Sequence, residues 1–399
     1  MNVRSEQLIP ESNFRRAGAG TFGLLFLLES LVRSLNSGVL SIQAYDLLGS
    51  SRAVSILGTC VSFTVLLITL CMPFLFGHVR RRWAYTIGGL MLISGSIALA
   101  SFTLPGQVTG VILRNSGASI MNVTLQLYIM DHIRKAELTR SEPLRLAVST
   151  FAWVSGTVSG VWLYTNYGAF APQLAAINVG LLVLCVFWYL RLHENITMPS
   201  GTLAPFNPLA NANRFAAQPR LRLAWAIAFG RSCFWGTFFT YGPLLMIEGG
   251  MSKFSGGLII SISQFFLLSA FGFGMLADRI GVRGVIAMCF SVISFSTIVA
   301  GLFGVHAPIV AAALLLLAAL FASGIDSVGG IPYLRAVRPS ERQRMTAVYR
   351  TFIDFSELIP GFIFAIALSY FDVSIVFIIL GVCLSALAIL VWRYLPKSM

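Results

Sequence analysis

The sequence has little charge: Asp, Glu, Lys and Arg together make up 11% of its 399 residues. A soluble protein of this length carries roughly 25%. Hydrophobic residues account for 57% of the chain, and the mean hydropathy is +0.82. One soluble core could not bury this much apolar surface, so the composition excludes an ordinary soluble domain and indicates a membrane protein.

Other absences narrow the class of protein. No cleavable signal peptide is visible, and the six cysteines lie inside apolar runs, where they are typical of small hydrophobic residues and not of a disulfide framework. The four histidines fall in loops or at the ends of apolar runs, and no cluster has metal-ligand spacing. No phosphate-binding GK[ST] loop occurs. We therefore expect no metal, no cofactor, no catalytic residues and no enzyme activity.

Apolar runs of about 20 residues, the length that crosses ~30 Å of hydrocarbon as a helix, recur along the chain. We predict an all-α polytopic membrane protein with twelve transmembrane helices in two pseudo-symmetric six-helix bundles. A polar gap with four prolines, 191–222, predicts a cytoplasmic linker between bundles 1–190 and 223–399. The expected spans are 21–45, 52–77, 84–103, 107–131, 146–166, 171–190, 223–246, 254–277, 284–303, 307–333, 346–369 and 373–395.

The distribution of basic residues sets the expected orientation. With both termini in the cytoplasm, the inner segments hold 22 of the 28 Lys and Arg residues, the outer loops hold 2, and the remaining 4 lie within spans. This split follows the positive-inside rule and predicts a multi-pass protein of the bacterial inner membrane. The net charge of +13 then faces anionic lipid heads, so we expect no nucleic-acid partner.

The two halves resemble each other in sequence. The stretch VRSLNSG (32–38) in the first span matches GRSCFWG (230–236) in the seventh, at an offset of 198. The stretch RSEPLR (140–145) after the fourth span matches PSERQR (339–344) after the tenth, at an offset of 199. Two matches at nearly one offset predict a parallel duplication, which is a known plan of membrane transporters.

A short motif carries a family resemblance. The stretch GMLADRIGVRG, between the eighth and ninth spans, resembles the loop signature G-x-x-x-D-R-x-G-R-R of the major facilitator superfamily. The matching residues are Gly274, Asp278, Arg279, Gly281 and Arg283. The resemblance implies that spans 1, 4, 7 and 10 line a central cavity. It also implies a gating role for the motif, with Asp278 reaching the start of the fifth span near Arg145 when the inner side closes.

Eight ionisable residues lie inside expected spans, where each costs roughly 2.5–3.5 kcal/mol on insertion scales and is a functional candidate by default. They are Glu29, Arg33, Arg114, Arg231, Asp326, Arg350, Asp354 and Glu357. Four are basic and four acidic, so structural pairing is the alternative interpretation for each. The spacing of Glu29 and Arg33, and of Arg350, Asp354 and Glu357, places each set on one helix face.

Arg33 and Arg231 occupy matching positions in the two halves, so we expect them to face one cavity and to bind an anionic group. They resemble the paired arginines of organophosphate/phosphate exchangers. Arg114 and Glu29 complete the candidate substrate site. Glu29 can neutralise Arg33, whereas position 227 is Ile, so we expect Arg231 to be the freer arginine. The alternative is that Arg231 has a structural partner, with Asp326 as one candidate.

The expected function is secondary active transport of a small organic solute by alternating access, with protons as the coupling ion and efflux as the favoured direction. Asp326, between glycines, is the first candidate for proton coupling, followed by Asp354 and Glu357. The alternative is an exchanger of organic anions or phosphate esters that uses Arg33 and Arg231. We expect a monomer in the lipid bilayer. An intramembrane enzyme and a passive channel are the remaining, less favoured classes.

Overall fold

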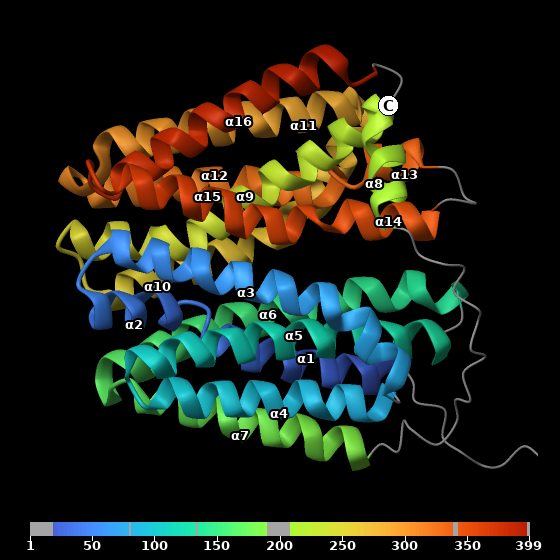
Figure 1. Cartoon of the computed structure of the whole chain (residues 1–399). Helices are drawn as coiled ribbons and strands as arrows, with labels where there is room; N and C mark the ends of the chain where they lie inside the picture. Colours follow the sequence, from blue (N-terminus) through green and yellow to red (C-terminus); the bar gives the residue numbers. More distant parts are fainter. Residues whose placement is uncertain (1–18, 80, 133–134, 190–207, 338–341, 397–399) are drawn as a thin grey trace, which may run out of the picture.

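The computed structural model describes residues 19–79, 81–132, 135–189, 208–337 and 342–396. Within these ranges every regular element is a helix. The helices run side by side in two groups, one stacked on the other, with α1–α7 below and most of α8–α16 above (Figure 1). We call these the first half and the second half.

In the first half, one span is broken into two helices. The break falls at 36–38, an Asn-Ser-Gly sequence whose side chains and flexible glycine favour turns over helix. Helix α1 packs against α6 and α7, and α4 packs against α5 and α7. The bounds are α1 Ala19–Leu35, α2 Val39–Leu48, α3 Ser51–His78, α4 Arg81–Ala100, α5 Leu104–His132, α6 Lys135–Tyr167 and α7 Phe170–Tyr189.

The second half begins with a short helix, α8 (Pro208–Ala217), which lies inside the expected linker. The end of the expected eighth span and the whole of the ninth form one long helix, α11, which bends at Gly281. The other bounds are α9 Pro219–Glu248, α10 Lys253–Phe265, η1 Phe266–Ser269, α11 Ala270–Phe303, η2 Gly304–His306, α12 Pro308–Val328, α13 Ile331–Ala336, α14 Arg342–Arg350, α15 Phe352–Ala367 and α16 Ser374–Tyr394.

Joined in this way, the helices of the described ranges make twelve crossings, which confirms the expected fold class. Within the described residues, seven stretches are long and apolar enough to cross a membrane by length and composition, and one of them, 253–306, is long enough to hold two crossings. The other four crossings are α5, α6, α9 and α14 with α15. Three of these four contain Arg114, Arg231 or Glu357, whose charges lower the mean hydropathy of their helices.

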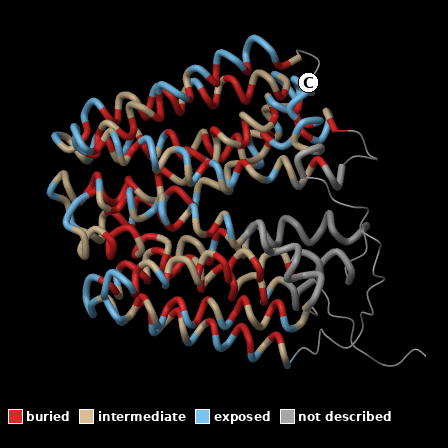
Figure 2. Tube along the Cα trace, in the orientation of Figure 1, coloured by how far each residue is buried: buried red, intermediate tan, exposed pale blue. Residues whose placement is uncertain are grey.

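The packing within the first half explains its closely spaced glycines. Gly156 and Gly160 on α6 face α1, where a Cβ atom at 160 would collide with the carbonyl oxygen of Leu35. This close approach is what the GxxxG spacing permits. Residues on the inward-facing sides of the helices are mostly buried, whereas many on the outward faces are exposed, as expected of faces that meet lipid (Figure 2).

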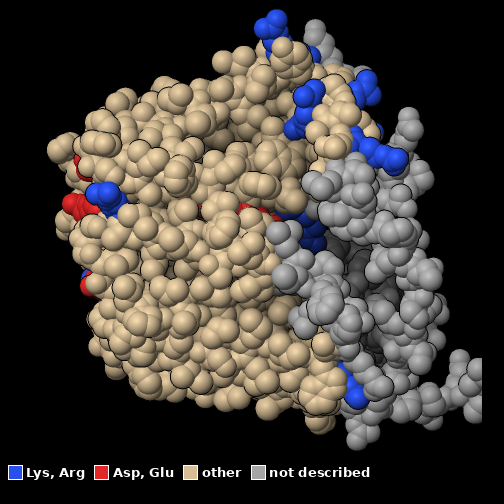
Figure 3. Space-filling model, viewed as in Figure 1, with Lys and Arg blue, Asp and Glu red and all other residues tan. Residues whose placement is uncertain are grey.

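The two ends of the bundle are chemically different. One end carries α2 and the turns at 49–50 and 249–252, and we call it the α2 end (Figure 1). The opposite end carries α8 and α13, and we call it the α8 end. On the face drawn in Figure 3, basic side chains gather mainly at this α8 end. Acidic side chains are visible in the seam between the halves.

The bend in α11 provides a test of the fold. Gly281 has φ 80° and ψ 153°, a conformation that is essentially restricted to glycine. We expect Gly281→Ala to destabilise the protein by about 1–3 kcal/mol. Gly284→Ala is the matched control, because a Cβ at 284 meets only Ile280 at an ordinary 3.5 Å. Thermal unfolding in detergent should show a lower midpoint for Gly281→Ala alone; equal midpoints would contradict the prediction.

Candidate functional site

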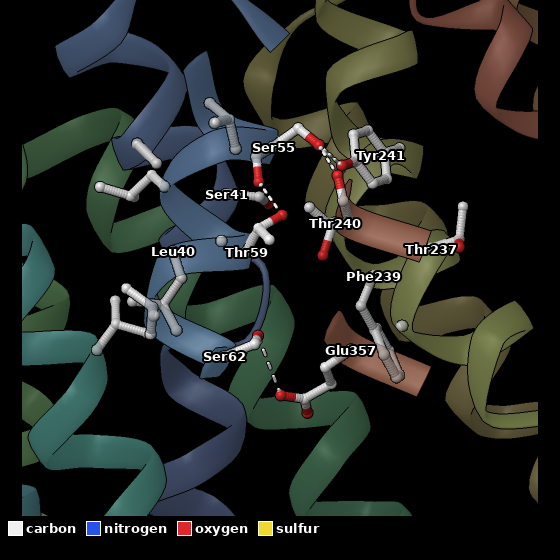
Figure 4. Close-up of a pocket in the computed structure, with 18 of the residues that line it drawn as sticks. Leu40, Ser41, Ser55, Thr59, Ser62, Thr237, Phe239, Thr240, Tyr241 and Glu357 are labelled. Atoms are coloured by element: carbon white, nitrogen blue, oxygen red, sulfur yellow. Dashed lines mark hydrogen bonds between the residues drawn. The ribbon is translucent and has the colours of Figure 1, made fainter. Parts of the chain in front are cut away.

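A cavity of about 290 Å³ lies between the two halves (Figure 4). Its walls come from the α1–α2 break, α2, α3 and α5 of the first half and from α9 and α15 of the second. Pockets for small molecules measure roughly 300–1,000 Å³, so this cavity is at the small end of the range. It offers room for a small organic molecule.

Hydroxyl and amide groups dominate the polar lining, and Glu357 is the one charged residue among the described residues that line the cavity. The carboxylate points into the cavity (Figure 4), where the Ser62 hydroxyl lies 3.5 Å from its Oε2 atom, at the outer limit of a hydrogen bond. The polar lining residues are Ser37, Ser41, Ser55, Thr59, Ser62, Gln107, Asn115, Thr237, Thr240, Tyr241, Ser356 and Glu357.

Ser55 on α3 closes the cavity towards the α2 end. The Tyr241 hydroxyl of α9 donates a hydrogen bond to Ser55 Oγ at 2.6 Å. The Ser55 hydroxyl in turn donates to the Gly361 carbonyl of α15 at 2.9 Å. These two bonds join the first half to two helices of the second half, immediately above the cavity in Figure 4.

A second set of polar contacts joins the halves farther towards the α2 end. Asp46 Oδ2 on α2 lies 2.6 Å from Lys253 Nζ on α10 and accepts a 2.6 Å hydrogen bond from the Tyr164 hydroxyl on α6. The Ser51 hydroxyl donates to Glu248 across the same seam. These contacts are not predictable from the sequence, because Asp46 and Lys253 are 207 residues apart.

Towards the α8 end, Arg231 on α9 pairs with Asp326 on α12, with 2.6 Å between Nη1 and Oδ1. The Trp235 indole donates to the other carboxylate oxygen at 3.0 Å. The two charged side chains are 29% and 20% exposed. The expectation that Arg231 is the freer arginine is wrong for this conformation; its partner comes from another helix, and the alternative pairing with Asp326 is found.

Arg33 has no acidic partner among the described residues. Its guanidinium lies over the Trp153 ring at 6.0 Å, and its backbone carbonyl accepts a hydrogen bond from Arg114. Glu29 is buried, and its Oε2 atom has no hydrogen-bond partner in the described part of the chain. Glu29 and Arg33 therefore share a helix without forming a close ion pair.

Three stacked rings lie between Arg33 and the Arg231–Asp326 pair. Trp153 of α6 stacks on Phe239 of α9 at 6.2 Å, and Phe239 stacks on Trp235 at 5.6 Å. The two arginines thus stand on either side of an aromatic bridge, and neither lines the cavity. Arg33 lies four residues from the lining residue Ser37, and Arg231 lies five residues from the lining residue Gly236. Each arginine is therefore displaced from the cavity by about 6–8 Å towards the α8 end.

The remaining predicted residues lie away from the cavity. Asp278 and Arg279 are exposed, and Asp278 has no partner among the described residues; the side chain of Arg145 lies outside them. Arg283 bonds the Trp392 carbonyl and stacks over that ring at 4.9 Å, tying α11 to α16. Gly274 faces Ser327 of α12.

Asp354 and Glu357 share α15, but Arg350 ends the preceding helix, α14. Thr351, between the two helices, keeps a right-handed helical conformation, and Arg350 interacts electrostatically with Asp354, in agreement with their spacing. Asp354 is partly exposed and does not line the cavity. The structure therefore brings Glu357 alone, of the three, into the cavity lining.

Comparisons with known proteins agree with this architecture. Residues 22–273 match the family model of the Major Facilitator Superfamily. No curated protein matches the chain in sequence. Among solved structures, a POT family transporter in complex with 5-aminolevulinic acid is similar, with a TM-score of 0.76, 14% identity and 98% of each chain covered.

Two further solved structures are similar. A POT family transporter in complex with a thioalcohol-conjugated peptide has a TM-score of 0.76 at 13% identity, covering 95% of this chain and 96% of that one. The nucleoside transporter NupG has a TM-score of 0.72 at 14% identity, covering 94% of this chain and 99% of its own. At these identities the likeness shows the fold alone.

The Arg231–Asp326 pair can be tested by a double-mutant cycle. Asp326→Asn and Arg231→Gln each leave one charge without its partner, which should cost about 1.5–3 kcal/mol for a charged hydrogen bond. The double variant should recover part of this loss, because it removes both charges. Thermal unfolding of the four proteins measures the coupling; purely additive losses would show that the pair contributes nothing.

Proposed function

Because the chain belongs to the Major Facilitator Superfamily and is a multi-pass secondary transporter, we propose that it moves a small organic solute across the bacterial inner membrane by alternating access. Protons are the coupling ion, and export is the direction. The protein works as a monomer. The halves 1–190 and 223–399 move as units joined by the linker 191–222, in which α8 lies.

One observation carries this proposal: a cavity lies between the halves, and the polar contacts that join the halves gather at its α2 side. Alternating access requires a site that opens to one side at a time. The contacts of Ser55, Asp46 and Ser51 form a gate at the α2 end, which must break when the α8 end closes.

The positive-inside rule places the α8 end in the cytoplasm, with both termini. The basic side chains seen at that end in Figure 3 support this orientation. The structure then represents the state closed to the outside. The latch proposed for Asp278 belongs to the opposite state, in which the cytoplasmic end closes, and this agrees with its lack of a described partner here.

Asp326, Asp354 and Glu357 are the proposed proton-coupling residues. Asp326 is held by Arg231 in this state, so a proton taken up by Asp326 would release Arg231. Trp235 donates a hydrogen bond to Asp326 and stacks on Phe239. Loss of the ion pair would therefore also change the contacts of the aromatic bridge between the halves. Protonation is thereby linked to the contact that must change during transport.

Exchange of organic anions or phosphate esters is the second candidate function. One observation favours it: Arg33 has no acidic partner among the described residues and lies near the cavity on its α8 side. In such an exchanger, Arg33 and Arg231 bind the anion, and Arg114 and Glu29 complete the substrate site. The aromatic bridge would have to part before both arginines could reach one anion.

A disulfide across the gate tests alternating access. A Cβ atom at position 361 would lie 3.7 Å from Thr59 Cβ, within the range for a disulfide. In a background without the native cysteines, we expect the Thr59→Cys/Gly361→Cys protein to lose transport in proteoliposomes when oxidised and to regain it when reduced. The single variants are the controls. Transport by the oxidised protein would contradict a moving gate.

The rate of disulfide formation also tests the latch. If Asp278 stabilises the state with a closed α8 end, Asp278→Asn should increase the population of the present state. The two cysteines should then oxidise faster than in the parent protein. An unchanged rate would show that the motif at 274–283 forms a turn and does not stabilise the state with a closed α8 end.

The coupling proposal predicts that Asp326→Asn loses transport driven by a pH gradient but keeps exchange of solute for solute. The amide preserves the size of the side chain and part of its hydrogen bonding but cannot load and release a proton. Both reactions are measured in the same proteoliposomes, with and without the gradient. Accumulation of solute against its own gradient by Asp326→Asn would assign coupling to another carboxylate.

A further inference from the structure

Glu357 is the one charged residue among the described residues that line the cavity, and its surroundings define what the cavity can bind. We propose that the cavity takes a positively charged organic solute, an amine or a quaternary ammonium, with Glu357 as its counter-ion. This inference rests on the proposed function, because it identifies the cavity with the site of the transported solute. It names a substrate class opposite in charge to the one that the two arginines suggest.

The carboxylate of Glu357 is poorly satisfied by the protein. Its described hydrogen bond, from Ser62, is 3.5 Å long. Glu357 is exposed and lines the cavity, so a ligand can reach its carboxylate. A carboxylate within a membrane-spanning segment favours a nearby cation or a proton. The described residues that line the cavity include no cation, so a neutralising charge would come from the solute or from a proton.

The nearby arginines are engaged elsewhere or lie outside the cavity. Arg231 is paired with Asp326, and Arg114 donates to the Arg33 carbonyl. Arg33 lies over Trp153, and Arg350 interacts with Asp354 and does not line the cavity. An anion in this cavity would therefore meet a carboxylate and no opposing charge.

The rest of the lining suits an organic cation. Phe239, Tyr241 and Phe364 line the cavity, and the faces of such rings attract ammonium groups. Thr237 Oγ1 is buried without a described partner, and Thr240 lines the cavity without a described hydrogen bond. These hydroxyls can bind polar groups of the solute. At about 30 Å³ per water, the volume holds about ten waters, which suits a molecule with a similar number of heavy atoms.

One carboxylate can hold a cation or a proton, and therefore binding of either displaces the other. The groups that interact with Glu357 are Asp354 on its own helix and the Ser62 hydroxyl on α3; the described lining residues of α2, α5 and α9 are neutral. With no cation among them, acidification protonates Glu357 and expels the solute. Proton entry would then drive export of the cation.

Three probes of similar shape and different charge test the inference: benzyltrimethylammonium, benzyl alcohol and phenylacetate. Binding to the purified full-length protein is measured by equilibrium dialysis at pH 8 and pH 5.5. We expect the ammonium to bind best, and more tightly at pH 8. Glu357→Gln should weaken its binding about tenfold or more, as the loss of a charged contact implies, and should abolish the pH dependence.

Glu357→Asp keeps the charge and should bind the ammonium more tightly than Glu357→Gln, which separates loss of charge from loss of folding. Asp372→Asn, on the surface near the start of α16, is the matched control for removing a carboxylate and should bind like the parent. Preference for phenylacetate, unchanged ammonium binding in Glu357→Gln, or no ammonium binding at all overturns the inference.

The binding test of the substrate class and the disulfide test of alternating access can fail independently. If the Thr59–Gly361 disulfide blocks transport but the cavity prefers the anion, the substrate class fails and the transport mechanism stands. If the ammonium binds through Glu357 but the disulfide leaves transport intact, the cation site stands and the proposed gate fails.

Discussion

The hydrogen bonds of Ser55 are the constraint on which the rest of the structure depends. They hold α3 against α9 and α15 at a single level, with the Asp46–Lys253 contact beyond it. Each bond is modest, on the order of 1 kcal/mol net. A few such bonds can hold a state and still break when a solute or proton binds, which is the energetic range that a switch between two states requires.

The charges within the membrane-spanning helices follow a common rule: each needs a partner, and the partner decides its role. Arg231 has Asp326, and this pair is stable but can be opened by one proton. Glu357 has only a distant hydroxyl, so it is available to a ligand. Arg33 has an aromatic face in place of an acid. Within one bundle, the same kind of residue thus serves as a structural tie, a binding group or a contact between the halves.

Residues close in sequence were predictable, and contacts across the fold were not. The apolar runs located the spans, and the close packing at Gly160 is what its GxxxG spacing permits. The spacing of Arg350, Asp354 and Glu357 agrees with the electrostatic contacts between neighbours, but it could not show that Glu357 alone of the three lines the cavity. The Ser and Thr residues of the cavity also gave no signal, since in helices they commonly bond backbone carbonyls one turn back, as Thr59 does here.

The distance in sequence between Arg231 and Asp326 has a consequence for biosynthesis. The arginine leaves the ribosome 95 residues before its partner, so at roughly 5–20 residues per second it waits about 5–20 s for neutralisation. During that time α9, which is not among the stretches apolar enough to cross a membrane by composition, has no aspartate to stabilise it in lipid. Insertion of this helix must therefore be helped by the translocation machinery or completed together with α12.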